Sequence, residues 1–292
     1  MDNAVTALVD EQAFGVRSMV APLRRVAVRP PSRRGDYEVA HWAHPLDLDL
    51  LEVQHAHFTA LLQRLGCLVE ILPPTDDMPD ACFVYDPAFV VPDGVIELRG
   101  AKAVRAGEPP VLAAQLAELG VPTVGRLMAP ATADGGDMLW LDDRTLAVGR
   151  TYRTNQAAID QLRAILAGQG IDVEAFDMPH DQGPEFCLHL MSVVSPVRED
   201  LAVVYQRLAP VALLQALRAR GIATVSVPEE DYPTLGCNVL AVAPGVAVLA
   251  DGNDATAALL RHRGVEVHEY DASEINKGEG GPTCLTRPVL RG

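Results

Sequence analysis

Apolar residues recur along the chain in five segments that share one arrangement: an amphipathic run, a glycine, and then a short β-branched run. The five glycines are Gly66, Gly120, Gly170, Gly221 and Gly264. Before each glycine the apolar residues recur at helical spacing, which predicts an amphipathic helix. A glycine directly after a helix commonly adopts the left-handed conformation that ends it. The run that follows is typical of a strand.

Four of the five predicted helices come after two apolar runs joined by a turn signal, which predicts a β-hairpin. The turn in "FVYDPAFVVPDGVIELRG" is Pro-Asp-Gly, and "DMLWLDDRTLAVG", "MSVVSPVREDLAVVY" and "CNVLAVAPGVAVLA" follow the same plan. Each unit is therefore predicted to be strand, strand, helix, strand. The first unit has a single N-terminal strand in "RRVAVRP", and we expect the last strand of the chain, in "CLTRPVLRG", to complete it.

A unit of this size cannot bury both faces of its small sheet alone, and stacking the units around an axis solves the problem. The sequence therefore predicts an α/β fold, a five-bladed pseudo-fivefold propeller of ββαβ units with helices outside and strands around a central channel. Periodicity alone leaves one alternative open, an open α/β sheet of two lobes. We expect a single domain over residues 1–292, of which residues 1–23 form an N-terminal extension.

Composition restricts the class of partner. The formal net charge is -15, which argues against nucleic acid, because its binding proteins carry basic patches. A small cationic molecule is the more natural ligand. The N-terminus has no signal-peptide pattern, and the most apolar stretch is too short to span a bilayer. Five irregularly spaced cysteines indicate reduced thiols, so we expect a cytoplasmic protein without a membrane partner. The sequence leaves open whether it forms a homo-oligomer.

Residues able to carry chemistry occur where the pattern breaks, before the second strand of successive units. In "PDACFVYDPAF", Asp80 and Asp86 are predicted to share one face of a strand, where two acids repel unless a cation lies between them. The alternative is that both acids stabilise turns. In "ATADGGDMLWL", Asp134 and Asp137 flank two glycines, which allow a close approach of the backbone to a ligand. A tight turn entering a strand is the alternative there.

A histidine and a cysteine occupy similar places in two other units. His189 is predicted to lie mid-strand in "FCLHLMSVVS", and Cys284 follows the glycine-rich "KGEGGPT". The alternatives are a core histidine and a buried free cysteine. A zinc site of Cys187, His189 and Cys237 is disfavoured, because no paired Cys-x-x-Cys spacing supports it. In a closed ring these positions meet at one mouth of the channel. A thiol beside an imidazole is a nucleophile with its proton shuttle, and the carboxylates favour a guanidinium.

Three segments carry a family resemblance: "DGGDMLWLDDRTLAVGRTYRTN", "CLHLMSVVS" and "EINKGEGGPTCLTRPVLRG". They resemble the dimethylarginine dimethylaminohydrolases of the pentein superfamily of guanidine-modifying enzymes. The resemblance runs from about "LRRVAVRPP" to the C-terminus and implies the five-bladed fold. It also implies a hydrolase that cleaves a substituted guanidine, an N-methylated L-arginine, to citrulline and an amine through a covalent thiouronium. No metal or organic cofactor is implied.

The resemblance assigns catalytic roles to three residues. It implies that Cys284 is the nucleophile, that His189 is the general acid and base, and that Asp134 is the catalytic carboxylate. Asp134 is a departure, because the family has a glutamate there, and its side chain is shorter by one methylene. Tyr85 is a second departure, at a position where relatives often carry a charged residue.

The resemblance also predicts how substrate is bound. The guanidinium would lie between acids, and the amino acid end would be held by arginines. The expected substrate-binding residues are Asp80, Asp86, Asp137, Arg105 and Arg153. The stretch "PPSRRGDY" would form the loop that covers the substrate.

Met191 separates the alternatives within the superfamily. Arginine deiminases and amidinotransferases resemble this chain too, but they carry an aspartate at this position, which binds the unsubstituted guanidine. Methionine there favours a substituted guanidine. An arginine deiminase or an amidinotransferase stays an alternative. In another class, so does a non-catalytic propeller like the ribosome anti-association factors of the superfamily, although Cys284 and His189 argue against it.

Overall fold

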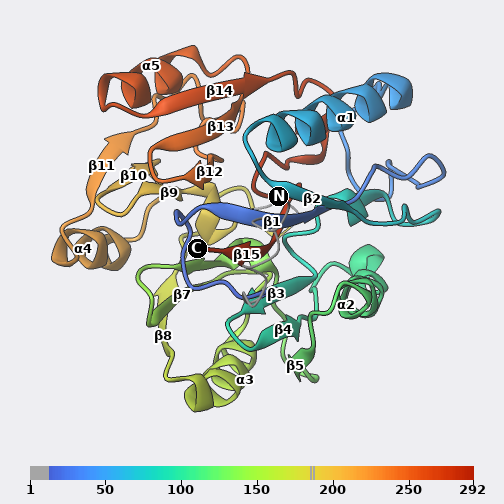
Figure 1. Cartoon of the computed structure of the whole chain (residues 1–292), viewed down its shortest axis with the longest axis horizontal. Helices are drawn as coiled ribbons and strands as arrows, with labels where there is room; N and C mark the ends of the chain where they lie inside the picture. Colours follow the sequence, from blue (N-terminus) through green and yellow to red (C-terminus); the bar gives the residue numbers. More distant parts are fainter. Residues whose placement is uncertain (1–12, 185, 187) are drawn as a thin grey trace, which may run out of the picture.

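The computed structural model describes residues 13–184, 186 and 188–292, and its strands form five three-stranded sheets arranged in a ring (Figure 1). One sheet consists of β15 (Arg287–Arg291), β1 (Leu23–Val28) and β2 (Leu68–Ile71), so the two ends of the chain close the ring. The other sheets are β3 (Ala88–Val91), β4 (Gly94–Glu97) and β5 (Thr123–Arg126); β6 (Met138–Trp140), β7 (Thr145–Arg150) and β8 (Asp172–Asp177); β9 (Val194–Arg198), β10 (Leu201–Val204) and β11 (Ala223–Ser226); and β12 (Leu240–Ala243), β13 (Val246–Ala250) and β14 (Glu266–Tyr270). The predicted ring of ββαβ units is confirmed, and the open two-lobed sheet was the wrong alternative.

Every sheet repeats one pairing scheme. Its first strand is antiparallel to the second, as β3 is to β4, and the second is parallel to the third, as β4 is to β5. All residues of β3 are buried, whereas β5 has mostly exposed residues. A strand that is apolar on both faces must be covered on both. The first strands therefore lie toward the centre of the ring and the third strands toward its outside.

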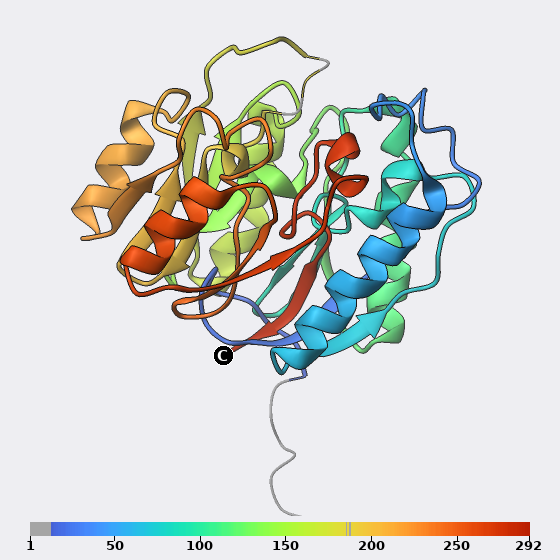
Figure 2. The same cartoon turned by 90° about the horizontal axis from the view of Figure 1, so that it is seen from above.

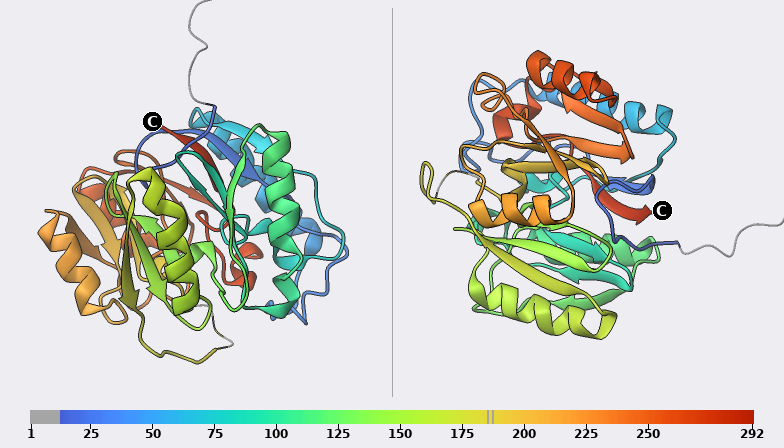
Figure 3. Two further views of the ribbon diagram at one scale, coloured as in Figure 1. Left: turned by 90° about the horizontal axis from the view of Figure 1, so that it is seen from below. Right: turned by 90° about the vertical axis from the view of Figure 1, so that its left-hand side faces the viewer.

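A helix connects the second and third strands of each unit and lies on the outside of the ring (Figure 3). The helices are α1 (Leu48–Arg64), α2 (Glu108–Glu118), α3 (Gln156–Leu166), α4 (Val211–Ala219) and α5 (Asp254–His262). The five glycines predicted to end them all have positive φ, from 66° at Gly170 to 89° at Gly66. Within the described part of the chain, no helix is both long and apolar enough to cross a membrane.

The N-terminal segment crosses one end of the ring, the end at which the C-terminus also lies (Figure 2). The Gly15 N–H donates to the Val289 carbonyl at 2.7 Å, and Val16 is buried in the core. Arg291 donates through Nη1 to the Ala21 carbonyl at 2.7 Å. The described part of the predicted N-terminal extension is thus packed against β15, while residues 1–12 lie outside the described chain.

Candidate active site

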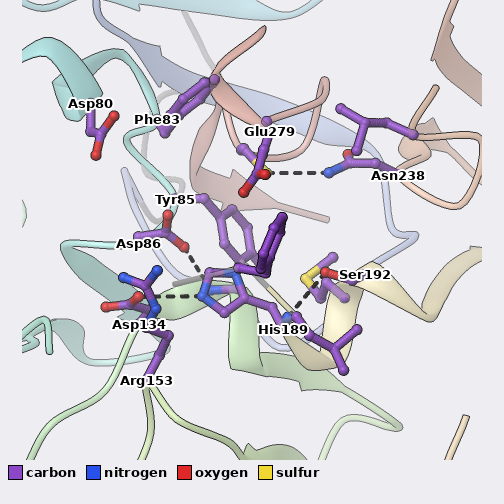
Figure 4. A pocket seen from close by; sticks show the side chains of 18 of the residues that line it. Asp80, Phe83, Tyr85, Asp86, Asp134, Arg153, His189, Ser192, Asn238 and Glu279 are labelled. Atoms are coloured by element: carbon purple, nitrogen blue, oxygen red, sulfur yellow. Dashed lines mark hydrogen bonds and ion pairs between the residues drawn. The ribbon is translucent and has the colours of Figure 1, made fainter. Parts of the chain in front are cut away.

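At the end of the ring opposite the N-terminal segment lies a cavity of about 390 Å³. Residues from all five units line it (Figure 4). Most come from the segments in front of the first strand of each unit, not the second strand as predicted, and a smaller group that includes Arg105 and Arg153 comes from the segments between the second strand and the helix. Seven of the eight predicted site residues are among them: Asp80, Asp86, Arg105, Asp134, Arg153, His189 and Cys284. The structure therefore gathers into one cavity residues that are up to 204 positions apart in the sequence, Asp80 and Cys284.

Asp80 and Asp86 do not share a strand, so that prediction was wrong. Asp80 lies in a 3-10 helix, η1 (Pro79–Cys82), and β3 begins only at Ala88. Pro79 begins this helix. Proline suits the first turn of a helix, because the N–H groups there have no partner within the helix and proline has no N–H to leave unpaired. Asp86 lies in a turn, where Oδ1 accepts the Gly136 N–H at 2.9 Å. The turn alternative was nearer to the structure.

His189 also lies outside a strand, contrary to the prediction. It precedes the 3-10 helix η5 (Leu190–Ser192), and its backbone N–H donates to Ser192 Oγ at 3.0 Å. Its Nε2 lies 3.3 Å from Asp134 Oδ2 (Figure 4). A Cβ on Gly136 would lie 2.2 Å from His189 Nδ1, so only glycine lets this histidine lie against the neighbouring backbone. The glycine pair thus permits a close approach to a side chain.

Asp137 does not reach the cavity, which corrects the expectation that it binds substrate. Its carboxylate accepts the Thr151 and Thr154 hydroxyls at 2.7 and 2.6 Å and the Leu190 N–H at 2.9 Å. Burial raises the pKa of Asp137 to about 6, although His189 and the two hydroxyls act to lower it. Asp137 therefore connects the third unit to the segment that carries His189.

The two acids of the second unit are already paired with cations of the chain itself. Asp80 accepts Lys102 Nζ and Trp42 Nε1, each at 2.7 Å. Asp86 Oδ2 accepts Arg105 Nη1 at 2.6 Å. The sequence analysis expected one cation between the two acids, whereas in the structure each acid pairs with its own cation, Asp80 with Lys102 and Asp86 with Arg105.

Arg105 is engaged on two sides. Besides Asp86, it contacts Glu108, with Nη2 2.8 Å from Oε2. Burial acts to raise the pKa of Asp86, but the Arg105 guanidinium holds it below its usual value. Burial raises the pKa of Glu108 to about 7 in spite of Arg105. The predicted carboxylate clamp is therefore an internal ion-pair partner in this structure.

Arg153 differs from Arg105. It is buried, it lines the cavity, and its Nε has no hydrogen-bond partner. Among the described residues no carboxylate forms an ion pair with it. An unpaired buried guanidinium is costly unless a ligand supplies the acceptor. Arg153 is thus the cavity cation best placed to meet an anionic group.

Cys284 is partly exposed to the cavity, unlike the other cysteines in the described ranges. Burial raises the pKa of Cys67 to about 11 and that of Cys237 to about 12, so both stay protonated thiols. Cys187 lies outside the described residues. Among those that are described, no three His, Cys, Asp or Glu side chains are placed to hold a metal ion.

Three further cavity residues were not predicted as site residues. Asn238 Nδ2 donates to Cys284 Sγ at 3.2 Å. Glu279 lines the cavity in the left-handed conformation, with φ of 59°, which is unusual for a residue other than glycine. His41 lines it next to the predicted covering loop, whose own residues 30–37 do not. A break in the strand pattern before "VLAVA" was the one available signal, and it pointed to Asn238.

A five-bladed ring around a cavity of thiol, imidazole and carboxylates defines the guanidine-modifying penteins. Comparison with protein families agrees, since the family described as arginine deiminase matches residues 73–224 and 208–291. The chain belongs to this family.

Relatives are of several kinds. The chain is 30% identical over 240 residues to the uncharacterized protein YkgA of Bacillus subtilis, covering 82% of this chain and 80% of that one. It is 26% identical over 257 residues to the arginine deiminase of Bacillus cytotoxicus, which covers 74% of this chain but only 63% of the deiminase. The chain thus spans less than two thirds of that enzyme's length.

Solved structures share the fold. DDAH from Pseudomonas aeruginosa, complexed with citrulline, superposes with a TM-score of 0.77 at 22% identity and covers 91% of this chain and 99% of that one. The N-terminal domain of ArgZ, an arginine dihydrolase from Cyanobacteria bound to product, has a TM-score of 0.79 at 20% identity, with 91% and 97% covered. At these identities the likeness establishes the fold.

Proposed function

We propose that the protein hydrolyses a substituted guanidine, with N-methylated L-arginine as the substrate, to citrulline and an amine through a covalent intermediate on Cys284. The observation that carries the proposal is the convergence of Cys284, His189 and Asp134 on one cavity, where Met191 contributes a thioether and no carboxylate. An unsubstituted guanidine N–H needs an acceptor, and an N-methyl group does not. Met191 is 5% exposed, so its side chain forms a dry part of the wall.

Substrate binding follows from the charges around the cavity. The guanidinium lies against Asp134 and Asp86. Both Asp86 oxygens already accept one hydrogen bond, but a carboxylate oxygen has a second lone pair and can accept from the substrate as well. Arg153 holds the substrate carboxylate. Arg105 would first have to release Asp86 or Glu108, so we assign it a supporting role.

The reaction then proceeds in two steps. Cys284 attacks the guanidinium carbon as a thiolate, His189 protonates the departing amine, and the C–N bond breaks to leave a thiouronium on sulfur. His189 next takes a proton from water, which attacks the same carbon. The C–S bond breaks, the ureido product leaves, and the thiolate is restored. Asp134, 3.3 Å from His189 Nε2, stabilises the imidazolium that gives up its proton in the first step and forms again in the second.

A panel of guanidines tests the proposal. Purified protein is incubated with arginine, monomethyl- and dimethylarginines, agmatine and smaller guanidines, and the ureido product is followed by mass. We expect the highest kcat/KM on a methylated arginine. Met191→Asp should move the ratio toward arginine by about tenfold, since it adds one charged acceptor, whereas Met191→Leu should leave the ratio unchanged. No turnover of any guanidine would overturn the proposal.

Arginine deiminase is the second candidate, because the matching family and several curated relatives carry that name. The same panel separates the two. A wild-type preference for arginine over every methylated arginine would select the deiminase.

A further inference from the structure

Each unit of the ring places a polar side chain on the cavity just in front of its first strand. Four of these positions already have proposed roles: Asp86, Asp134, His189 and Cys284. The fifth unit, β12–β14, has Asn238 at the corresponding place, two residues before Leu240 begins β12. Fivefold repetition of the fold thus points to a fifth functional position that the mechanism above does not use.

The direction of the Asn238 hydrogen bonds is fixed by its neighbour. Asn238 Oδ1 lies 3.1 Å from the backbone nitrogen of Thr283. That nitrogen can only donate, so the amide oxygen must face it. The NH₂ group must then face the sulfur of Cys284, which lies 3.2 Å from Nδ2. The amide therefore donates an N–H to the sulfur.

The Asn238 side chain is also held in place. Its backbone N–H donates to the Leu235 carbonyl at 2.8 Å. A Cβ on Gly281 would lie 2.6 Å from Asn238 Cγ, so the glycine of the Cys284 loop is what lets the amide come this close. With the oxygen bound to Thr283 and the glycine backbone behind it, the amide presents its N–H to one place only.

A hydrogen-bond donor at the Cys284 sulfur can offset the effect of the carboxylates that line the cavity. Negative charge near a thiolate disfavours it, and the carboxylates that line the cavity are those of Asp80, Asp86, Asp134, Asp181 and Glu279. Of the cations that line it with Arg153, Lys102 is paired with Asp80 and Arg105 with Asp86. A lysine or arginine beside the sulfur would favour the thiolate but would repel a guanidinium substrate. A neutral amide donor stabilises the thiolate without that repulsion, because a hydrogen bond to the charged form favours that form.

We propose that Asn238 is a further catalytic residue, whose amide N–H stabilises and orients the Cys284 thiolate before the substrate arrives. The inference rests on the proposed function only in taking Cys284 as the reacting thiol. A fixed donor that needs no reorganisation during the reaction is the kind of group that lowers a barrier electrostatically.

Alkylation of the free enzyme tests this without any substrate. The rate at which iodoacetamide modifies Cys284 is followed against pH by peptide mass. In Asn238→Ala the half-maximal pH should rise by about one pH unit, and kcat/KM on the best substrate should fall about tenfold, as expected for one hydrogen bond to a charged group. Asn238→Asp should shift the profile further, because its carboxylate repels the thiolate. Gln182→Ala, which removes another cavity amide, should match the wild type.

The outcomes are separable. If both Asn238 variants fold with unchanged melting temperature and keep the wild-type alkylation profile, the inference is wrong even where guanidine turnover is intact. If the profile shifts as expected while no guanidine is turned over by the wild type, the proposed function falls and the role of Asn238 at the thiol stands.

Discussion

Buried arginines have different surroundings at the two ends of the ring's centre. We call the end covered by the N-terminal segment the closed end and the end that holds the cavity the open end. At the closed end Arg287 is 1% exposed and donates to the carbonyls of Tyr85 and Ala88 at 3.0 and 2.7 Å. Its guanidinium carbon lies 4.1 Å from the centre of the Tyr85 ring, and the free space beside it is about 10 Å³. At the open end the cavity is about 390 Å³ and Arg153 is one of the residues that line it; the Nε atoms of Arg153 and Arg287 both lack a hydrogen-bond partner among the described residues.

Residue type does not distinguish these two arginines; their partners do. The acceptors of Arg287 are backbone groups and aromatic faces that belong to the fold, and burial lowers its pKa. Arg153, by contrast, lines the cavity and forms no ion pair with a carboxylate among the described residues. Tyr85 lines both the small space beside Arg287 and the large cavity that Arg153 lines. The Tyr85 side chain therefore lies between the surroundings of the two arginines.

The largest effect is expected at the open end. Cys284→Ser should lower kcat/KM by at least about a thousandfold, because a hydroxyl is a far weaker nucleophile than a thiolate, while the melting temperature stays unchanged. Activity on the best guanidine of the panel and a thermal melt measure the two quantities.

Cys237→Ser is the matched control, because Cys237 lines the same cavity but remains a protonated thiol. It should keep nearly full activity. A covalent adduct trapped on another cysteine with Cys284 unmodified would show that the nucleophile has been misassigned.

At the closed end we expect a substitution to lower stability and to leave activity nearly unchanged. Arg287→Met removes the donor to two buried carbonyls, each of which then costs on the order of 1–3 kcal/mol, and we expect a loss of about 3 kcal/mol in the free energy of unfolding. Activity per folded molecule should change little. Urea unfolding and titrated kcat/KM test both parts. An equally stable variant that has lost activity would mean that Arg287 serves the cavity and that the comparison of the two ends is wrong.

Most of the fold could be predicted from the sequence, because the signals are local. Each helix end is marked by a glycine that needs positive φ, as at Gly120 and Gly264, and each hairpin has its own turn residues. Closure of the ring by the terminal strands followed from one unit lacking a strand. The strand predicted over residues 80–86 does not form, because Pro79 begins the 3-10 helix η1 and β3 starts only after Pro87.

The site was only partly predictable, because its pairings are long-range. Trp42 and Lys102 both reach Asp80, and nothing in their local sequence indicates it. The pairing of Arg105 with Asp86, 19 positions earlier in the chain, is likewise visible only in the structure. The sequence could therefore predict that a residue lies on the cavity. It could not predict which of its donors and acceptors are engaged by other side chains of the protein.

A smaller effect than that of Cys284→Ser, and one that tests how the open end is built, is expected at Asp134. Asp134→Asn should lower kcat/KM by about a hundredfold on the best substrate, since it removes the charge that faces His189 Nε2 and orients the cation. Melting temperature should stay within a few degrees, because the backbone contact of Asp134 to Thr154 Oγ1 is retained. If kcat/KM were unchanged, Asp134 would be a turn residue only.

Asp134→Glu decides whether the shorter acid is matched to its surroundings. In the family the acid is longer by one methylene, about 1.5 Å. Here Asp134 Oδ2 already lies 3.3 Å from His189 Nε2, so a side chain longer by one methylene would have to displace its carboxylate or the imidazole. We expect Asp134→Glu to lower kcat/KM on the best substrate by about tenfold, with the KM raised because the substrate is displaced. If the variant instead gained activity on dimethylarginine while losing it on the wild type's best substrate, the cavity would be shaped for a different guanidine, and the short acid would be a determinant of specificity.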